Sequence, residues 1–412
     1  MRRTVWLGAA LLTVVGVGCA DSQGAAETAA AQARQASVRE VPTFQVDPTW
    51  PKLPAKWALG LVADVYVDAQ DHVWIQHRFR TAKPGPNQTA APPVLEFDAD
   101  GNFIQGWGGP GQGYDWPASE HGIFLDHNGY VWLGGEGGNT GQVLKFTKTG
   151  KFVMQIGRPG QSKGSLDTRN FNGASDIWVN PKNNEVFIGD SNGHGRVIVL
   201  DGATGAFKRM WGGFGKPPSD PPPGEPLAQL PNDAGGGFDV TTGDGPPFLS
   251  QAHCIRVSND GFMYVCDGPF KRIQVFTLDG KYVTQVFINR GARPKSTNTA
   301  MSSLGRPFNE VEEELYGHHE TSSRAGLSGD REQRYLFVND RSTSKVLILD
   351  RKTLEVLGSF GDGPGRAPGQ FYVLHDVRAD SKGNVYTAEV NGDGNRRAQK
   401  FVFKGMRTVS TQ

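Results

Sequence analysis

The stretch HGIFLDHNGYVWLGGEGGNTGQVLKFTKTGKFVMQIG, residues 121–157, decides the fold. It contains two hairpins in succession, HGIFLDHNGYVWL and VLKFTKTGKFVMQIG. In each hairpin, apolar runs rich in β-branched and aromatic residues flank a short polar turn that contains glycine, which is the pattern of two antiparallel strands. Two such hairpins make a four-stranded unit of roughly 45 residues, the size of one β-propeller blade.

The same unit recurs along the chain. Counterparts of the second hairpin are VLEFDADGNFIQGWG from Val94, VIVLDGATGAFKRMWG from Val197, IQVFTLDGKYVTQVF from Ile273 and VLILDRKTLEVLGSFG from Val346. The units begin near Val62, Glu120, Ala174, Ala252, Ala325 and Leu374. We therefore predict an all-β protein, a six-bladed β-propeller over residues 43–403.

The last unit ends near residue 403 and lacks an outer strand. We expect the segment TFQVDPTW, residues 43–50, to supply that strand and close the ring, which removes free sheet edges. Two Pro/Gly-rich insertions, residues 216–247 and 291–324, fall between units, where long loops can cover one face. Residues 404–412 are expected to be a C-terminal tail.

The N-terminus has the pattern of an export signal. Met-Arg-Arg precedes a short apolar run that ends in small residues before Cys19, so residues 1–19 are interpreted as a signal peptide. Cys19 could become the lipidated first residue of a lipoprotein, or the chain could simply be secreted. Residues 20–42, rich in Ala, Gln and Ser, are expected to be a flexible tether. The sequence thus predicts a periplasmic or outer-envelope protein whose contact with the membrane is limited to a lipid anchor.

The net charge and the two remaining cysteines give information about binding partners and about a possible disulfide. The net charge is +1, so the chain lacks the electrostatic footprint of a nucleic-acid-binding protein. We expect a monomer with a small-molecule substrate. Cys254 and Cys266 flank one hairpin turn and would lie nearly opposite each other on neighbouring strands. In an exported protein they could form a disulfide, and two buried free thiols are equally compatible with the pattern.

Three histidines occupy equivalent positions in alternate units: His121, His253 and His375 each open the first strand of their unit. In a propeller, the first strand of every blade lines the central channel. Blades two, four and six would therefore bring three imidazoles to one point of the channel, with an open position between them. The alternative is that these polar residues of the channel only hydrogen-bond one another and trapped water. Three convergent imidazoles favour a metal site, and zinc fits this ligand set best, with copper as a minor alternative. Blades one and three carry Asp64 and Asp176 at the matching position, whereas blade five shows only small residues around Ala325.

The loops after the second strands should open on the same face as these histidines. They offer Arg78 as a partner for an anion or oxyanion, Asn192 and Lys271 as further substrate contacts, and His194 as a candidate base. Asp376 directly follows the third histidine and could orient it or bind a second, hard cation such as calcium.

At these residues the chain resembles the NHL-repeat propellers and, among them, the peptidyl-α-hydroxyglycine α-amidating lyases. The resemblance covers nearly all of residues 43–403. It implies a six-bladed propeller, a zinc ion on His121, His253 and His375, and cleavage of a carbinolamide to an amide and glyoxylate. It also implies a structural calcium held by Asp376 and the backbone carbonyls near Val65 and Ile123.

Two positions depart from the lyase pattern. Asn192 stands where the family has a catalytic tyrosine, and Gly268 follows Asp267 where the family has an active-site arginine. Arg78 matches the arginine of a family His-Arg pair. The three metal-binding histidines of the family are kept, whereas the catalytic tyrosine and one active-site arginine are replaced. We therefore expect a changed substrate or a changed reaction.

Three function classes therefore follow from the sequence. The first is an exported, zinc-dependent lyase-like enzyme or hydrolase acting on a small molecule, in which zinc polarises a substrate oxygen. The second is a non-catalytic NHL propeller that binds a protein or glycan at the cell envelope. The third, a copper redox protein, lacks an evident Cys or Met ligand in the channel.

Overall fold

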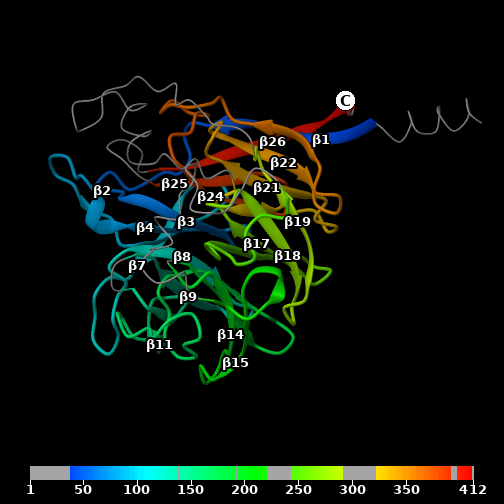
Figure 1. Ribbon diagram of the computed structural model, residues 1–412. Helices are drawn as coiled ribbons and strands as arrows, with labels where there is room; N and C mark the ends of the chain where they lie inside the picture. Colours follow the sequence, from blue (N-terminus) through cyan, green and yellow to red (C-terminus); the bar gives the residue numbers. More distant parts are fainter. Residues whose placement is uncertain are drawn as a thin grey trace, which may run out of the picture. The chain divides into compact units, whose positions relative to one another are not determined.

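The computed structural model describes residues 38–137, 140–191, 193–219, 243–290, 322–390 and 397–410 (Figure 1). The signal peptide with Cys19, most of the tether, Asn192 and the greater part of both insertions lie outside these residues. Within them, no helix is long and apolar enough to span a membrane.

Six four-stranded antiparallel sheets make up the fold, in agreement with the predicted six blades. Blade one contains β3 (Leu61–Val67), β4 (Val73–Arg78), β6 (Val94–Phe97) and β7 (Phe103–Trp107). Blade two contains β8 (Glu120–Leu125), β9 (Tyr130–Gly135), β10 (Gln142–Thr147) and β11 (Phe152–Gly157). Blade three contains β12 (Ala174–Val179), β13 (Glu185–Asp190), β14 (Arg196–Asp201) and β15 (Phe207–Trp211). Blade four contains β16 (Cys254–Val257), β17 (Phe262–Asp267), β18 (Arg272–Thr277) and β19 (Tyr282–Phe287). Blade five contains β20 (Ala325–Leu327), β21 (Tyr335–Asp340), β22 (Lys345–Asp350) and β23 (Val356–Phe360). Blade six contains β24 (Leu374–Ala379), β25 (Val385–Glu389), β26 (Ala398–Ser410) and β1 (Val38–Asp47). A short parallel pair, β2 (Trp57–Ala58) with β5 (Thr89–Ala90), and two 3-10 turns, Phe79–Thr81 and Gly213–Gly215, complete the described elements.

The first strands of the blades form a closed ring. β3 contacts β8, β8 contacts β12, and the series continues through β16, β20 and β24 back to β3. The ring is closed as the sequence predicted, because β1 pairs with β26 as the outer strand of the last blade. Within that blade the Thr43 hydroxyl donates to the Gly405 carbonyl at 2.9 Å. The last blade is therefore built from both ends of the chain, as sheet-edge closure requires.

Two boundaries differ from the expectation. β1 begins at Val38, inside the expected tether, and β26 continues to Ser410, through most of the expected tail. Residues 42–405 form one compact unit. The outer ends of the two strands, up to Val41 and from Met406, belong to a second unit, whose described part is extended chain.

Aspartates in the hairpin turns explain why each unit folds locally. Asp126 accepts hydrogen bonds from the main-chain N–H groups of Asn128 and Tyr130, both at 2.9 Å, and from the indole Nε1–H of Trp132 at 2.8 Å. One carboxylate thus caps the turn and anchors a fully buried aromatic side chain on the next strand. Asp68 repeats these contacts with Trp74 in blade one.

The interiors of neighbouring blades pack through apolar side chains and close backbone contacts. One cluster combines Trp132 of blade two with Ile188 and Ile198 of blade three. Near the channel, Gly134 lies so close to blade three that a Cβ there would collide with the Ala174 carbonyl oxygen. The missing side chain therefore lets β9, the second strand of blade two, approach β12, the innermost strand of blade three.

In blade four, Cys254 and Cys266 face each other across β16 and β17 and form a disulfide, with their Cα atoms 4.9 Å apart. Of the two arrangements that the sequence left open, the structure has the bonded one. The bond ties together the two inner strands of blade four directly beside His253.

Candidate metal centre

The three predicted histidines meet in the channel. His121 lies in β8, His253 directly precedes β16, and His375 lies in β24. Their candidate ligand nitrogens all lie within 4.8 Å of one another, and the ring centroids are 4.7–5.3 Å apart. The residues are 0%, 4% and 3% exposed, respectively. The sequence argument from alternate blades therefore led to a real cluster.

Local irregularity in the inner strands aims these side chains. The register of β8 against β9 shifts between Glu120 and Ile123, and the register of β24 against β25 shifts between Leu374 and Asp376. A β-bulge places an extra residue in one strand and re-aims its side chain. His121 and His375 fall within these two shifts, which explains how a strand residue can point along the channel mouth.

Each histidine is held by the next blade through Nδ1. Nδ1 of His253 lies 2.8 Å from the Ser323 carbonyl oxygen and Nδ1 of His375 lies 2.5 Å from that of Ala63, so both can donate to it; Nδ1 of His121 lies 2.8 Å from the carbonyl oxygen of Ser175. A carbonyl can only accept, so His253 and His375 carry their proton on Nδ1 and present a lone pair at Nε2. That arrangement fixes the tautomer and orientation that metal-binding histidines require.

His121 has a second neighbour at Nδ1. The Arg324 guanidinium donates from Nη2 to that nitrogen at 2.6 Å and to the Ser175 carbonyl at 2.9 Å. Burial lowers the pKa of His121 to about 4, so the ring is neutral at pH 7. Burial, together with His121 and Arg324, also holds the pKa of His375 well below its usual range. Neutral imidazole is the form that binds a metal ion.

A carboxylate that the sequence reasoning missed completes the cluster. Glu136 follows β9, and its Oε2 lies 3.2 Å from Nε2 of His253 and in closer contact with Nε2 of His121. Burial acts to raise the pKa of Glu136, but His121 and His253 outweigh it and hold the pKa well below the usual value. Glu136 occupies the blade-two loop at the same face as Arg78 and Asp190 of the neighbouring blades, but no repeat of the sequence distinguishes it from the other polar residues of these loops.

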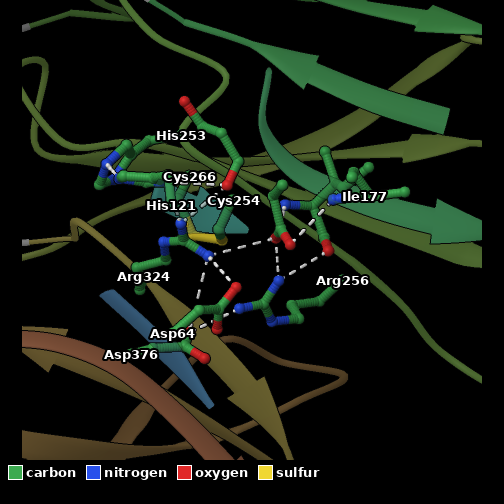
Figure 2. Close-up of polar contacts among 12 residues, drawn as sticks. Asp64, His121, Ile177, His253, Cys254, Arg256, Cys266, Arg324 and Asp376 are labelled. Atoms are coloured by element: carbon green, nitrogen blue, oxygen red, sulfur yellow. Dashed lines mark hydrogen bonds and ion pairs between the residues drawn. A yellow bond between two sulfur atoms is a disulfide. The ribbon is translucent and has the colours of Figure 1, made fainter. Parts of the chain in front are cut away.

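Below the histidines, the channel is filled by three aspartates and three arginines. Arg324 lies 3.4 Å from Asp64 and 3.8 Å from Asp376 (Figure 2), and it lies 3.7 Å from Asp176. Arg256 bridges Asp176 and Asp376, and Arg378 lies 3.2–3.8 Å from all three carboxylates. We call these six residues the Asp–Arg layer.

The carboxylates of this layer also join neighbouring blades. Asp64 accepts from the main-chain N–H of Ile123 at 3.0 Å, and Asp176 accepts from that of Ile255 at 2.8 Å. Arg324 directly precedes β20 and is fully buried. The expectation that blade five offers only small residues to the channel was therefore wrong.

The residues implied for calcium do not fit that ion. Asp376 is occupied by Arg256 at 2.7 Å and Arg378 at 3.2 Å, and the Val65 carbonyl accepts from Arg378 at 3.1 Å. The main chain of Ile123 contributes its N–H to Asp64. Calcium requires six to eight oxygen ligands, whereas guanidinium groups already neutralise the oxygens here.

The zinc ligands, by contrast, fit their implied ion. Three nitrogens converge, two of them with the tautomer fixed by a carbonyl, and burial lowers the pKa values of His121 and His375 so that these two rings are uncharged at neutral pH. His121, His253 and His375 would hold the metal, and Glu136 lies against them.

Arg78 lies at the edge of this site. It is half-buried at the end of β4, and its Nε donates to the Glu120 carbonyl at 3.1 Å. Burial lowers the pKa of Arg78, opposed by the charges of Glu136 and Glu120. Arg78 is therefore held against Glu120, the residue that precedes His121, and it supplies a guanidinium of the kind that pairs with an anion.

The other predicted substrate contacts are placed differently. Lys271 is a buried turn residue with φ of 54°, and its main-chain N–H donates to the Gly268 carbonyl. Asn192 lies outside the described residues. Among the described contacts, none brings Lys271 to the histidines.

His194 is buried rather than exposed on its loop. Its Nδ1 contacts Asp190 at 2.7 Å and its Nε2 contacts the Ser162 hydroxyl at 3.0 Å. Asp190 is also paired with Arg196 and accepts from the main-chain N–H groups of residues 172 and 173. This network anchors the loop before β12, so a role for His194 as base would require breaking one of its two contacts.

Together these features define a class: a six-bladed β-propeller with a buried three-histidine and carboxylate cluster in its channel. No family model matches the sequence. The chain is 28% identical over 246 residues to NHL repeat-containing protein 3 of Homo sapiens, and 26% identical over 247 residues to that of Mus musculus. The matches cover 57% and 58% of this chain, respectively, and the same shares of the relatives, so the chain spans little more than half the length of the curated relatives it matches.

Two solved structures are similar at lower identity. One is virginiamycin B lyase from Staphylococcus aureus, at 12% identity and a TM-score of 0.42, covering 85% of this chain and 81% of that one. The other is a protein of unknown function from Bacteroides thetaiotaomicron, at 12% identity and a TM-score of 0.47, covering 89% and 77%. The comparisons thus support similarity to NHL-repeat proteins, and the more specific resemblance to amidating lyases is not confirmed by them.

Proposed function

We propose that this protein is a metal-dependent enzyme of the lyase or hydrolase type, which acts on a small molecule at the three-histidine mouth of its channel. The observation that carries the proposal is the convergence of His121, His253 and His375 with their Nδ1 atoms on carbonyl oxygens of the next blade. A purely structural bridge between blades needs only one of the two ring nitrogens. The second ring nitrogens of the three histidines also converge, and a bound metal ion would explain that convergence.

Zinc, when bound, would supply a Lewis acid that polarises a substrate oxygen. The chain's own residues would do the rest. Arg78 would hold an anionic group of the substrate at the edge of the site, because a guanidinium matches carboxylate geometry. Burial of the histidines would exclude water from the side of the Asp–Arg layer.

The proposal extends to the protein's location. The N-terminal pattern supports export to the periplasm or outer envelope, with attachment to the membrane only through a lipid on Cys19. An oxidising compartment is also where the Cys254–Cys266 disulfide would persist.

Metal analysis of purified protein tests the proposal. We expect about one zinc per chain in the wild type and in His127→Ala, a matched exposed histidine, and little zinc in His253→Ala. Zinc content unchanged by His253→Ala would exclude the centre. A peptidyl-α-hydroxyglycine is the first substrate to assay, with glyoxylate release as the readout, and release that persists in His253→Ala would contradict the proposed role of the histidines.

A second function, binding without catalysis, has its own supporting observation. A cavity of about 550 Å³ lies among the hairpin turns that join the first and second strands of blades one to four. Tyr66, Phe124 and Trp178 line it together with Asp68 and Lys148. Such a site could take a glycan or a peptide side chain. Quenching of Trp178 fluorescence by a ligand, lost in Trp178→Phe and retained in His253→Ala, would favour this function.

A further inference from the structure

Glu136 is placed on the histidines by its own surroundings. Its main-chain N–H donates to the Ser119 carbonyl at 3.0 Å, which fixes the loop after β9. Its Oε1 accepts from the Ser191 hydroxyl at 2.8 Å, and Ser191 in turn contacts Ser175 of the channel strand β12. One carboxylate oxygen is thus held by blade three while the other points at the imidazoles.

The distances match the edges of a coordination polyhedron. Nε2 of His253 lies 3.1 Å from Nε2 of His121 and 3.2 Å from Oε2 of Glu136. Zinc binds nitrogen and carboxylate oxygen at about 2.0–2.2 Å, so two ligands at the tetrahedral angle lie roughly 3.3–3.5 Å apart. The two distances from His253 are therefore within a few tenths of an ångström of this spacing, whereas His121 and Glu136 lie in closer contact and would have to separate to hold one ion between them.

The chemistry of the facing atoms points the same way. Nδ1 of His253 donates to the Ser323 carbonyl, so its Nε2 offers only a lone pair to Glu136 and His121. A carboxylate oxygen also offers only lone pairs. One proton shared between His121 and Glu136 can satisfy a single pair of these atoms, whereas a cation at their common centre satisfies all of them.

Charge balance requires a carboxylate at this position. The three aspartates of the Asp–Arg layer are matched by three arginines, so that layer has no spare negative charge for an ion above it. Arg324 reaches up to His121, only one ring away. A divalent cation on three neutral imidazoles beside this guanidinium would be a buried, uncompensated charge, which proteins avoid. Glu136 compensates half of it.

We propose that Glu136 is the fourth protein ligand of the metal centre, which makes a three-histidine, one-carboxylate set. This inference rests on the proposed function in taking the three histidines as ligands. It changes the expected chemistry, because a substrate oxygen must enter as a fifth ligand or displace Glu136. Ser191 is a positioning residue that keeps the carboxylate turned toward the ion.

The test uses the full chain, purified without metal and loaded with Zn²⁺ or Co²⁺. Zinc affinity is measured by competition with a chelator, and the visible absorption of Co²⁺ reports coordination number and donor type. The variants are Glu136→Gln, which keeps the shape of the side chain, Ser191→Ala, and Glu332→Gln as an exposed control of the same chemistry. Far-UV circular dichroism of the metal-free proteins monitors the fold.

We expect Glu136→Gln to weaken zinc binding by about 100-fold and to change the Co²⁺ spectrum, Ser191→Ala to weaken it by about tenfold, and Glu332→Gln to do neither. His253→Ala should abolish binding. If His253→Ala abolishes binding while Glu136→Gln keeps both the wild-type affinity and the wild-type spectrum, the inference about Glu136 is overturned and the proposed function stands. If His253→Ala binds zinc as tightly as the wild type does, the centre itself is wrong. If Glu136→Gln does not fold, Ser191→Ala decides by the same two readouts.

Discussion

Removing Arg324 should destabilise the propeller more than any single surface change. The guanidinium is fully buried and lies 3.4–3.8 Å from all three carboxylates of the Asp–Arg layer. At an effective dielectric constant of about 20, each contact is worth roughly 4–5 kcal/mol before desolvation and the repulsion from Arg256 and Arg378 are subtracted. Breaking a buried ion pair by removing one partner costs about 3–5 kcal/mol net. We expect Arg324→Met to lose that amount.

Urea unfolding of chelator-treated protein measures this loss without any contribution from bound metal. The companion variant Asp64→Asn keeps an acceptor for the Ile123 N–H while removing one carboxylate. The loss of unfolding free energy in the double variant should be smaller, by at least about 1 kcal/mol, than the sum of the losses in the two single variants, because the residues share one network. Arg324→Met with wild-type stability, or strictly additive losses, would refute this account of the channel.

The pH dependence of Arg324→Met provides an independent check. Burial, together with Asp376, raises the pKa of Asp64 well above its usual value. Loss of Arg324 raises it further, which favours the protonated carboxyl of the folded state. A raised folded-state pKa contributes stability that is present at low pH and is lost as the pH rises through it. The penalty for Arg324→Met should therefore be smaller at pH 5 than at pH 8.

Three further outcomes are expected. Burial lowers the pKa of His77 to about 4, so the contribution of His77 to the free energy of unfolding is full above its unfolded value of about 6.5 and falls by about 3 kcal/mol as the pH drops through 4; urea titrations of His77→Gln should show a weaker pH dependence than those of the wild type, and an unchanged pH dependence would contradict this role. Reduction of the Cys254–Cys266 disulfide should cost about 3 kcal/mol by the loop-entropy relation, measured as a shift of the unfolding midpoint that is absent in a Cys254→Ala, Cys266→Ala double variant. Millimolar Ca²⁺ should leave the melting temperature unchanged. A calcium site would stabilise the fold by about 2.7 kcal/mol at a free Ca²⁺ concentration of 100 times its Kd, so a rise in melting temperature that is specific to calcium would show that the site exists.

The sequence revealed the parts of this molecule that repeat. Hairpins such as residues 121–157 carry their own strand and turn signals, so six blades and the closing strand could be predicted. The three histidines could be placed because they occupy one position of that repeat. Glu136 and Arg324 could not, since each occurs once and in a loop, and what they contact depends on which blades the channel brings face to face. The Asp–Arg layer is likewise a property of the closed ring.

The same geometry separates a metal centre from a structural use of the three histidines. Each Nδ1 lies against a carbonyl of the next blade, and the bonds of His253 and His375 alone would join their blades without any ion. An asparagine or serine could make that bond with less bulk in a buried position. Imidazole adds a second nitrogen. The candidate ligand nitrogens of all three histidines lie within 4.8 Å of one another, and those of His121 and His253 meet the oxygen of Glu136, whose pKa is held well below its usual value. Lone pairs brought together in a buried site destabilise a fold unless a cation compensates them, so the Nε2 side of the cluster is the part whose arrangement a metal explains.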